Sequence, residues 1–167
     1  MKPNTERNDR IRLIFSNSPL PLSLAIRLVT WSEWSHVGII LDDERVIDAT
    51  YTHHGVKIRT LNDFKKSSHY WTIVEVEVAD RREIVKAAIS QLDKPYDITG
   101  LFGVLFQNYH WNEDDSWFCS EFVAYAFLKG GTPIVDGGYI WRVTPQKVWD
   151  YRHTVIMSGY GGAGVLY

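Results

Sequence analysis

The chain has 167 residues, of which 45% are hydrophobic and 23% charged, and its net charge at pH 7 is -2. This length and composition suit one domain around a single core. The small net charge, and the absence of any Lys/Arg block longer than a pair, argue against nucleic acid as a partner. We expect one domain over residues 1–167, with flexible stretches at 1–10 and at the glycine-rich end, 159–167.

A single cysteine provides no disulfide framework within the chain. The first ten residues lack the apolar segment of a secretory signal, and no run reaches the roughly 18 apolar residues of a membrane-spanning helix. We therefore expect a cytoplasmic protein without an integral membrane segment. A phage-encoded or injected enzyme is the alternative if the substrate lies outside the cytoplasm.

The first half of the chain is predicted to be mainly β-strand. A helix is expected over 20–31, with Leu24, Leu28 and Trp31 on one side. The last two predicted strands alternate in the way that is typical of antiparallel strands with one exposed face. The strand-length runs, each bounded by turn residues, are 11–15, 36–41, 45–50, 56–61 and 71–78.

The second half is predicted to be mainly helical. One helix begins after Asp80, a helix-capping residue with Glu83 three positions on, and ends before Pro95. Thr144 is expected to cap a short helix that begins at Pro145. Two further helices are expected over 98–106 and 118–129. The order of elements predicts an α+β domain in which helices pack on an antiparallel sheet.

Cys119, the only cysteine, lies at the start of the helix expected over 118–129. The unpaired N–H groups and the dipole at a helix N-terminus stabilise a thiolate. A lone cysteine on an apolar helix face is nevertheless more often a small core residue. Cys119 therefore requires a neighbouring base to be a nucleophile. The apolar residues that follow it at helical spacing are Phe122, Val123, Ala126 and Phe127.

Among six histidines, only His36 begins a strand that is expected at the centre of the sheet. A three-residue loop over 42–44 would place Gly38 opposite Asp48, so that both share a face with His36. Glycine leaves room there for the two polar side chains to meet. Because a carboxylate in an apolar strand needs a partner, Asp48 is expected to orient His36. A loop of even length would place them on opposite faces.

Several segments together resemble the circularly permuted papain-like enzymes of the NlpC superfamily, nearest the YiiX/YebB-like group. In ordinary NlpC-type hydrolases the cysteine helix precedes the histidine strand, whereas here His36 comes first. The resemblance implies a permuted papain-like fold, in which helices pack on a barrel-like antiparallel meander. It extends over about 11–151 and is carried by residues 35–39, 46–50, 55–56, 94–97 and 118–123.

By this resemblance, Cys119 is the nucleophile, His36 the general base and Asp48 the third polar residue of a catalytic triad. The implied chemistry is attack of a thiolate on an amide or ester carbonyl to form an acyl-enzyme. We expect a cysteine hydrolase that cleaves an amide bond. Its substrate would be a small peptide, such as one derived from peptidoglycan, or an N-acyl amino compound.

The resemblance also indicates residues around the nucleophile. Tyr96 is similar to the tyrosine that NlpC-type enzymes place beside the cysteine, where it would help hold an oxyanion; the alternative is an ordinary buried tyrosine. Trp34 and Trp117 are candidates for contact with the substrate. No cofactor is expected.

Three other functions stay open from the sequence. A thioesterase or acyltransferase acting on lipid-like acyl groups would use the same residues, and a non-catalytic binding module would keep only the fold. The complete set of cysteine, histidine and aspartate argues against the second. A zinc site is disfavoured because its candidate ligands lack standard spacing; these are His53, His54, His110 and Cys119.

Overall fold

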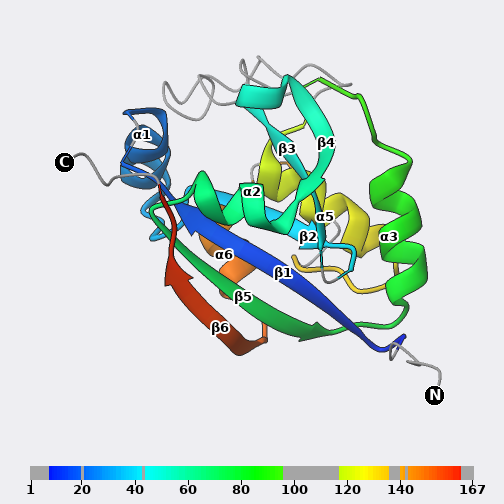
Figure 1. The fold of residues 1–167 in the computed structure, drawn as a ribbon. Coiled ribbons are helices and arrows are strands. Elements are labelled where there is room, and N and C mark those ends of the chain that lie inside the picture. Colours follow the sequence, from blue (N-terminus) through cyan, green and yellow to red (C-terminus); the bar gives the residue numbers. More distant parts are fainter. Residues whose placement is uncertain are drawn as a thin grey trace.

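The structure is a computed structural model that describes residues 8–19, 21–42, 44–95, 117–135, 140–141 and 143–162. Its centre is an antiparallel sheet of six strands in the order β4-β3-β2-β1-β5-β6 (Figure 1). The strands are β1 (Arg10–Asn17), β2 (His36–Ile40), β3 (Arg45–Thr50), β4 (Gly55–Thr60), β5 (Tyr70–Glu77) and β6 (Thr154–Tyr160).

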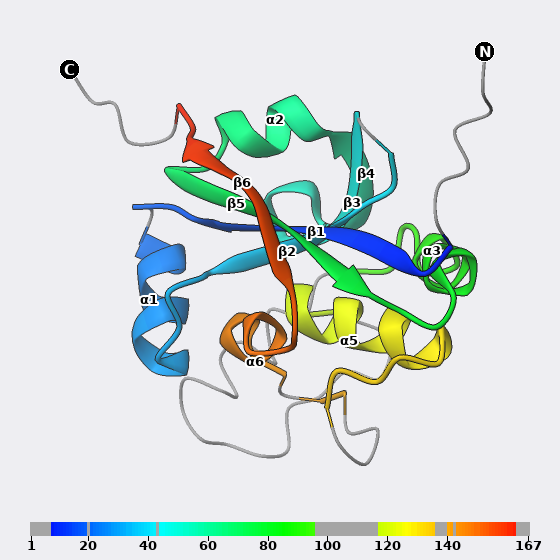
Figure 2. The ribbon, with the colours of Figure 1, turned by 90° about the horizontal axis from the view of Figure 1, so that it is seen from below.

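Helices cover both faces of this sheet. Figure 2 shows α2 on one side of the sheet, and α5 and α6 on the other. The described helices are α1 (Pro21–Thr30), α2 (Leu61–Lys66), α3 (Arg81–Ile89), α5 (Cys119–Lys129) and α6 (Pro145–Trp149), with a 3-10 turn at Tyr51–His53. The mixed architecture agrees with the α+β class expected from the sequence.

Each face of the sheet has its own hydrophobic cluster. The larger one packs α5, including Phe122 and Phe127, against the sheet. The smaller one surrounds Phe64 of α2. Along β1, Leu13 contributes to the larger cluster and Ile14 to the smaller one, as the twofold alternation of a strand requires. The central strands are therefore apolar on both faces.

The hairpin of β2 and β3 has the register that a three-residue loop predicts. Ile39 lies opposite Ile47, and Ile40 lies opposite Val46. The Leu41 N–H donates a hydrogen bond of 2.9 Å to the Arg45 carbonyl, which closes the loop. This register places Gly38 opposite Asp48, and it confirms the odd loop length on which the proximity of His36 and Asp48 depends.

Helix-capping residues were also predicted correctly. The Asp80 side chain accepts from the N–H groups of Arg82 and Glu83 at the start of α3. The Thr144 hydroxyl accepts from the Lys147 N–H at the start of α6. The helix expected over 118–129 is α5, which begins at Cys119. The helix expected over 98–106 lies outside the described residues.

The ends of the described chain differ from the sequence-based expectation. Gly159 and Tyr160 were expected to be flexible, but they belong to β6, which pairs with β5. A Cβ at position 159 would lie 2.6 Å from the Trp71 ring, so glycine here permits close packing. Arg10, also expected in a flexible stretch, begins β1 and lies opposite Glu77.

Two helical features were not anticipated. The first is α2, a six-residue helix that Thr60 caps by accepting from the Asp63 N–H. The second is the orientation of α1: Leu24 and Leu28 are exposed by 47% and 66%, and Trp31, directly after the helix, by 91%. The apolar side expected for this helix therefore faces solvent.

Candidate active site

Cys119 is the first residue of α5 and is fully buried. The residue before it, Phe118, has extended backbone angles and makes no side-chain cap to the helix. The thiol lies 4.0 Å from the Ser35 carbonyl oxygen, directly before β2. The sulfur is thus held between the N-terminus of an 11-residue helix and the beginning of the histidine strand, where the helix dipole favours a negative charge.

His36 is the first residue of β2, and its side chain is 18% exposed. Its Nε2 lies 2.5 Å from the Asp48 Oδ2, and the Asp48 side chain is fully buried. Gly38 separates the two along the same face. A Cβ there would lie 3.1 Å from the Asp48 Cβ and 2.7 Å from the Val46 Cγ1. The structure therefore brings His36 and Asp48 together across a glycine, as the sequence predicts.

The surroundings of His36 favour its protonated form. Burial by itself would lower the pKa of His36, but the hydrogen bond to Asp48 and the interaction with the Cys119 thiol outweigh it and raise the pKa to about 9. Because Nε2 faces Asp48, Nδ1 is the nitrogen left for the thiol proton. The arrangement suits a thiolate beside an imidazolium ion.

Asp48 has a second partner that sequence reasoning missed. The Arg59 Nη2 donates to the Asp48 Oδ2 at 2.6 Å, and its Nε lies 3.2 Å from both carboxylate oxygens. Burial tends to raise the pKa of Asp48, but the hydrogen bond and charge of His36, together with Arg59, hold it below its usual value. The alternation of residues 56–61 could have identified this partner. Lys57 lies opposite Asp48, and Arg59, two residues further on, shares the same face of the sheet.

The other candidate residues are placed as follows. Trp34 is 4% exposed and stacks on Tyr70, with ring centroids 5.9 Å apart. Trp117 is 6% exposed, and its indole N–H donates to the Gln91 side chain at 3.3 Å. Both tryptophans therefore pack in the core, and contact of either with a substrate stays a prediction. Tyr96 lies outside the described residues.

The described part of the chain contains no group of three or more His, Cys, Asp or Glu side chains placed to hold a metal ion. Cys119 lies beside His36, and His54 is exposed at a left-handed backbone position with φ of 56°. His110 and the side chain of His53 are not among the described parts. The disfavoured zinc site gains no support from these residues.

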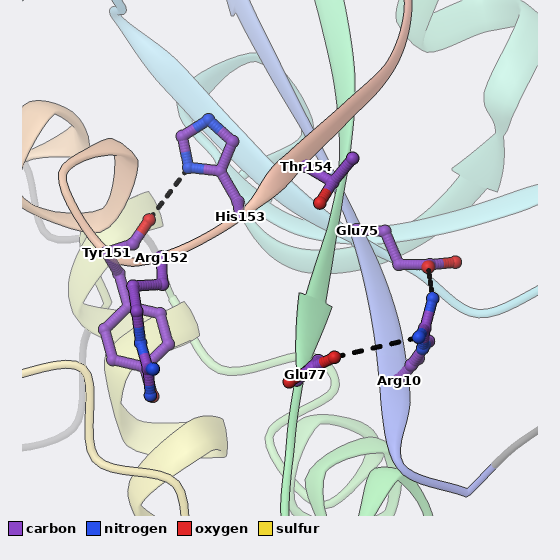
Figure 3. A pocket seen from close by; sticks show the side chains of 7 residues that line it. All are labelled: Arg10, Glu75, Glu77, Tyr151, Arg152, His153 and Thr154. Atoms are coloured by element: carbon purple, nitrogen blue, oxygen red, sulfur yellow. Dashed lines mark hydrogen bonds and ion pairs between the residues drawn. The ribbon is translucent and has the colours of Figure 1, made fainter.

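A surface pocket of about 240 Å³ lies on the half of the sheet formed by β1, β5 and β6 (Figure 3). Arg10 approaches Glu75 and Glu77 on one side of it, and His153 lies across from them. None of Cys119, His36 and Asp48 lines this pocket; the lining residues are Arg10, Glu75, Glu77, Tyr151, Arg152, His153 and Thr154. Its position does not coincide with the candidate active site.

A histidine strand that precedes a cysteine helix, on a helix-covered antiparallel sheet, defines a permuted papain-like architecture. The family described as "permuted papain-like amidase enzyme, YaeF/YiiX, C92 family" matches residues 12–150. The chain belongs to this family. The family is one of amidase-type enzymes, in agreement with the resemblance and with the expected cysteine peptidase or amidase class.

Two known proteins are similar to this chain. The probable lipoprotein peptidase YaeF of Escherichia coli K12 is 28% identical over 84% of the chain, which spans 62% of that relative's length. The crystal structure of the metalloprotein yiiX from Escherichia coli O157:H7 has a TM-score of 0.68 at 20% identity, over 91% of this chain and 98% of that one. The second similarity shows a shared fold. The metal implied by that name belongs to that protein, and the described residues here show no matching cluster.

No helix in the described part of the chain is long and apolar enough to cross a membrane. The cytoplasmic location stays a prediction, since YaeF is named a lipoprotein peptidase.

Proposed function

We propose that this chain is a cysteine hydrolase that cleaves an amide bond through Cys119, His36 and Asp48. The observation that carries the proposal is the contact of 2.5 Å between His36 and the buried Asp48, beside a cysteine at a helix N-terminus. Family membership supports the amidase class. The substrate class proposed is a small peptide or an N-acyl amino compound.

In the first half of the reaction, His36 Nδ1 holds the proton that comes from the Cys119 thiol, and the thiolate attacks the carbonyl carbon of the substrate. The resulting oxyanion is held by the N–H of Cys119 and, in this proposal, by Tyr96. As the carbon–nitrogen bond breaks, His36 donates the proton to the leaving amine. The product is a thioester between the acyl group and Cys119.

In the second half, His36 accepts a proton from a water molecule, and the water oxygen attacks the thioester carbon. The carbon–sulfur bond breaks, the sulfur leaves as a thiolate beside the protonated His36, and a carboxylic acid is released. Asp48 accepts the hydrogen bond from Nε2 throughout, which fixes the imidazole tautomer that presents Nδ1 to the sulfur.

Substrate screening tests this function. We expect release of an amine from muropeptides or N-acyl amino acids, lost in Cys119→Ser and in His36→Gln. His54→Asn is the matched control, because His54 is exposed and asparagine tolerates its left-handed backbone. Intact-mass detection of an acyl adduct on Cys119 would identify the intermediate. Turnover that survives Cys119→Ser would overturn the proposal.

The same experiment separates the alternatives. Acyl thioesters or lipid-like esters cleaved in preference to amides would indicate the thioesterase or acyltransferase function, which uses the same three residues. Binding without turnover of any substrate, unchanged in Cys119→Ser, would indicate a non-catalytic module.

A further inference from the structure

Four side chains from four elements form a closed ring, of which the carboxylate of Asp48 on β3 is one member. His36 on β2 and Arg59 on β4 both bond to it, at 2.5 and 2.6 Å. Phe64 of α2 closes the ring, because it stacks on His36 with centroids 5.4 Å apart and carries the Arg59 guanidinium 4.4 Å above its face. Each polar member thus has a defined neighbour on both sides.

The Arg59 side chain is itself oriented by a hydrogen bond at the end of α2. This side chain is only 14% exposed. The Nη1 donates to the Ser67 hydroxyl at 3.0 Å, and that hydroxyl donates to the Phe64 carbonyl at 2.9 Å, at the end of α2. The planar guanidinium therefore presents Nε and Nη2 to the carboxylate in a fixed orientation, which a lysine ammonium cannot reproduce.

The choice of cation on this face is selective. Lys57 lies directly opposite Asp48 in the β3–β4 register, yet its ammonium pairs with Asp93. Arg59, two residues further along the strand, reaches back to Asp48 instead. Lys57 is therefore a suitable control for Arg59, because it is a cation on the same strand and the same face that does not contact the Asp48 carboxylate.

Asp48 is a buried carboxylate next to a histidine that gains and loses a proton during the reaction, so its counter-ion is not present at every step. While His36 is an imidazolium ion, Asp48 has a counter-ion; once His36 has given its proton to the leaving group, the carboxylate would remain buried and uncompensated. The guanidinium group of arginine stays charged throughout the physiological pH range. Arg59 compensates Asp48 in both states.

We propose that Arg59 is a positioning residue of this active site, which keeps Asp48 ionised and correctly oriented through both protonation states of His36. This inference rests on the hydrolase function proposed above. The titratable groups against His36 in the described structure are Asp48 on β3 and Cys119 on α5, with the Arg59 charge behind Asp48. Because Arg59 offsets part of the Asp48 charge, it limits how strongly Asp48 holds the proton on His36.

Titration of the His36 imidazole by NMR tests the role directly, with the signal assigned from His36→Gln. In Arg59→Met we expect the midpoint to rise by about one pH unit, because the Asp48 charge is no longer offset. The alkaline limb of hydrolysis should move with it. Lys57→Met should leave the midpoint unchanged. A folded Arg59→Met protein with the wild-type midpoint would overturn the inference.

Arg59→Lys provides a second test of the inference if the Arg59→Met protein does not fold. Lysine keeps the positive charge but lacks the planar guanidinium that bonds to the carboxylate through two nitrogens. We therefore expect a near wild-type midpoint of the His36 titration and a kcat lowered by about tenfold with KM unchanged. A wild-type kcat in Arg59→Lys would contradict the positioning role. Turnover that survives Cys119→Ser would overturn the hydrolase function alone, since the titration of His36 does not depend on any substrate.

Discussion

Two ion-pair clusters on one sheet contain similar side chains in different surroundings. On β3 and β4, Asp48 is completely buried and Arg59 is 14% exposed. On β1 and β5, Arg10 is 39% exposed, and it pairs with Glu75 at 2.7 Å and Glu77 at 3.7 Å, which are 28% and 86% exposed. The geometry of the best pair in each cluster is nearly the same, so burial is what distinguishes them.

This difference in burial determines which of the two clusters is suited to catalysis. Exposed ion pairs contribute little, because water solvates each charge nearly as well as its partner does. A buried carboxylate depends on its partners for its charge, and it changes the proton affinity of any base it touches. The surface pocket at the Arg10 cluster is therefore a poorer candidate for catalysis than the enclosed contact between His36 and Asp48.

The largest effect is expected when the buried cluster loses its carboxylate. Asp48→Ala leaves the Arg59 guanidinium and His36 without their shared partner, which should lower the free energy of unfolding by about 3–5 kcal/mol. Urea denaturation measures this. Asp42→Ala is the control in the same hairpin, since Asp42 pairs with Arg45 at the surface. Equal losses in the two variants would contradict the comparison.

The next effect is a dependence of stability on pH. The folded pKa of His36, about 9, lies above its ordinary value of 6.5. The imidazolium ion therefore stabilises the folded state fully below pH 6.5, and this contribution is lost as pH rises through 9. It amounts to about 3 kcal/mol. Denaturation at pH 6 and above pH 9 should show the loss in the wild type and a smaller one in His36→Gln. Identical pH dependences would contradict the assignment.

A smaller effect is expected from filling the space between the two residues. Gly38→Ala introduces a Cβ that would lie 2.7 Å from the Val46 Cγ1 and 3.1 Å from the Asp48 Cβ. The strands must separate to admit it, which should cost about 1–3 kcal/mol of stability and reduce hydrolysis by displacing Asp48 from His36. Thermal unfolding and initial rates measure the two effects. Wild-type activity in a folded Gly38→Ala protein would show that the contact tolerates displacement.

The parts of this site that the sequence predicts are those governed by local rules. The odd length of the 42–44 loop fixes the register of β2 against β3. Once the register is known, the residues of β2 that face one side of the sheet determine which residues of β3 face the same side. The start of α5 follows from the apolar spacing after Cys119. Each inference spans only a few residues, so the order of residues along the chain is enough to predict that His36 and Asp48 lie close together.

What the sequence did not predict depends on contacts between distant segments. The role of Arg59 is not predicted, because the alternation of residues 56–61 indicates a strand but not its register against β3. Glycine at position 159 indicated flexibility, whereas it permits β6 to pack closely on Trp71. The orientation of α1, whose apolar side faces solvent, is equally not predicted from the sequence. Periodicity identifies an apolar stripe on a helix but not which part of the protein, if any, packs against it.

The smallest effect is expected from the exposed cluster. Arg10→Met removes the guanidinium that pairs with Glu75 and Glu77, but all three remain accessible to water. We expect Tm to change by less than about 2 °C, hydrolysis to stay at the wild-type rate, and the His36 titration to be unaffected. Arg59→Met is the matched replacement at the buried cluster, where Tm should fall and the titration should shift. If Arg10→Met altered hydrolysis as much as Arg59→Met, the surface pocket would have to be reconsidered as part of the active site.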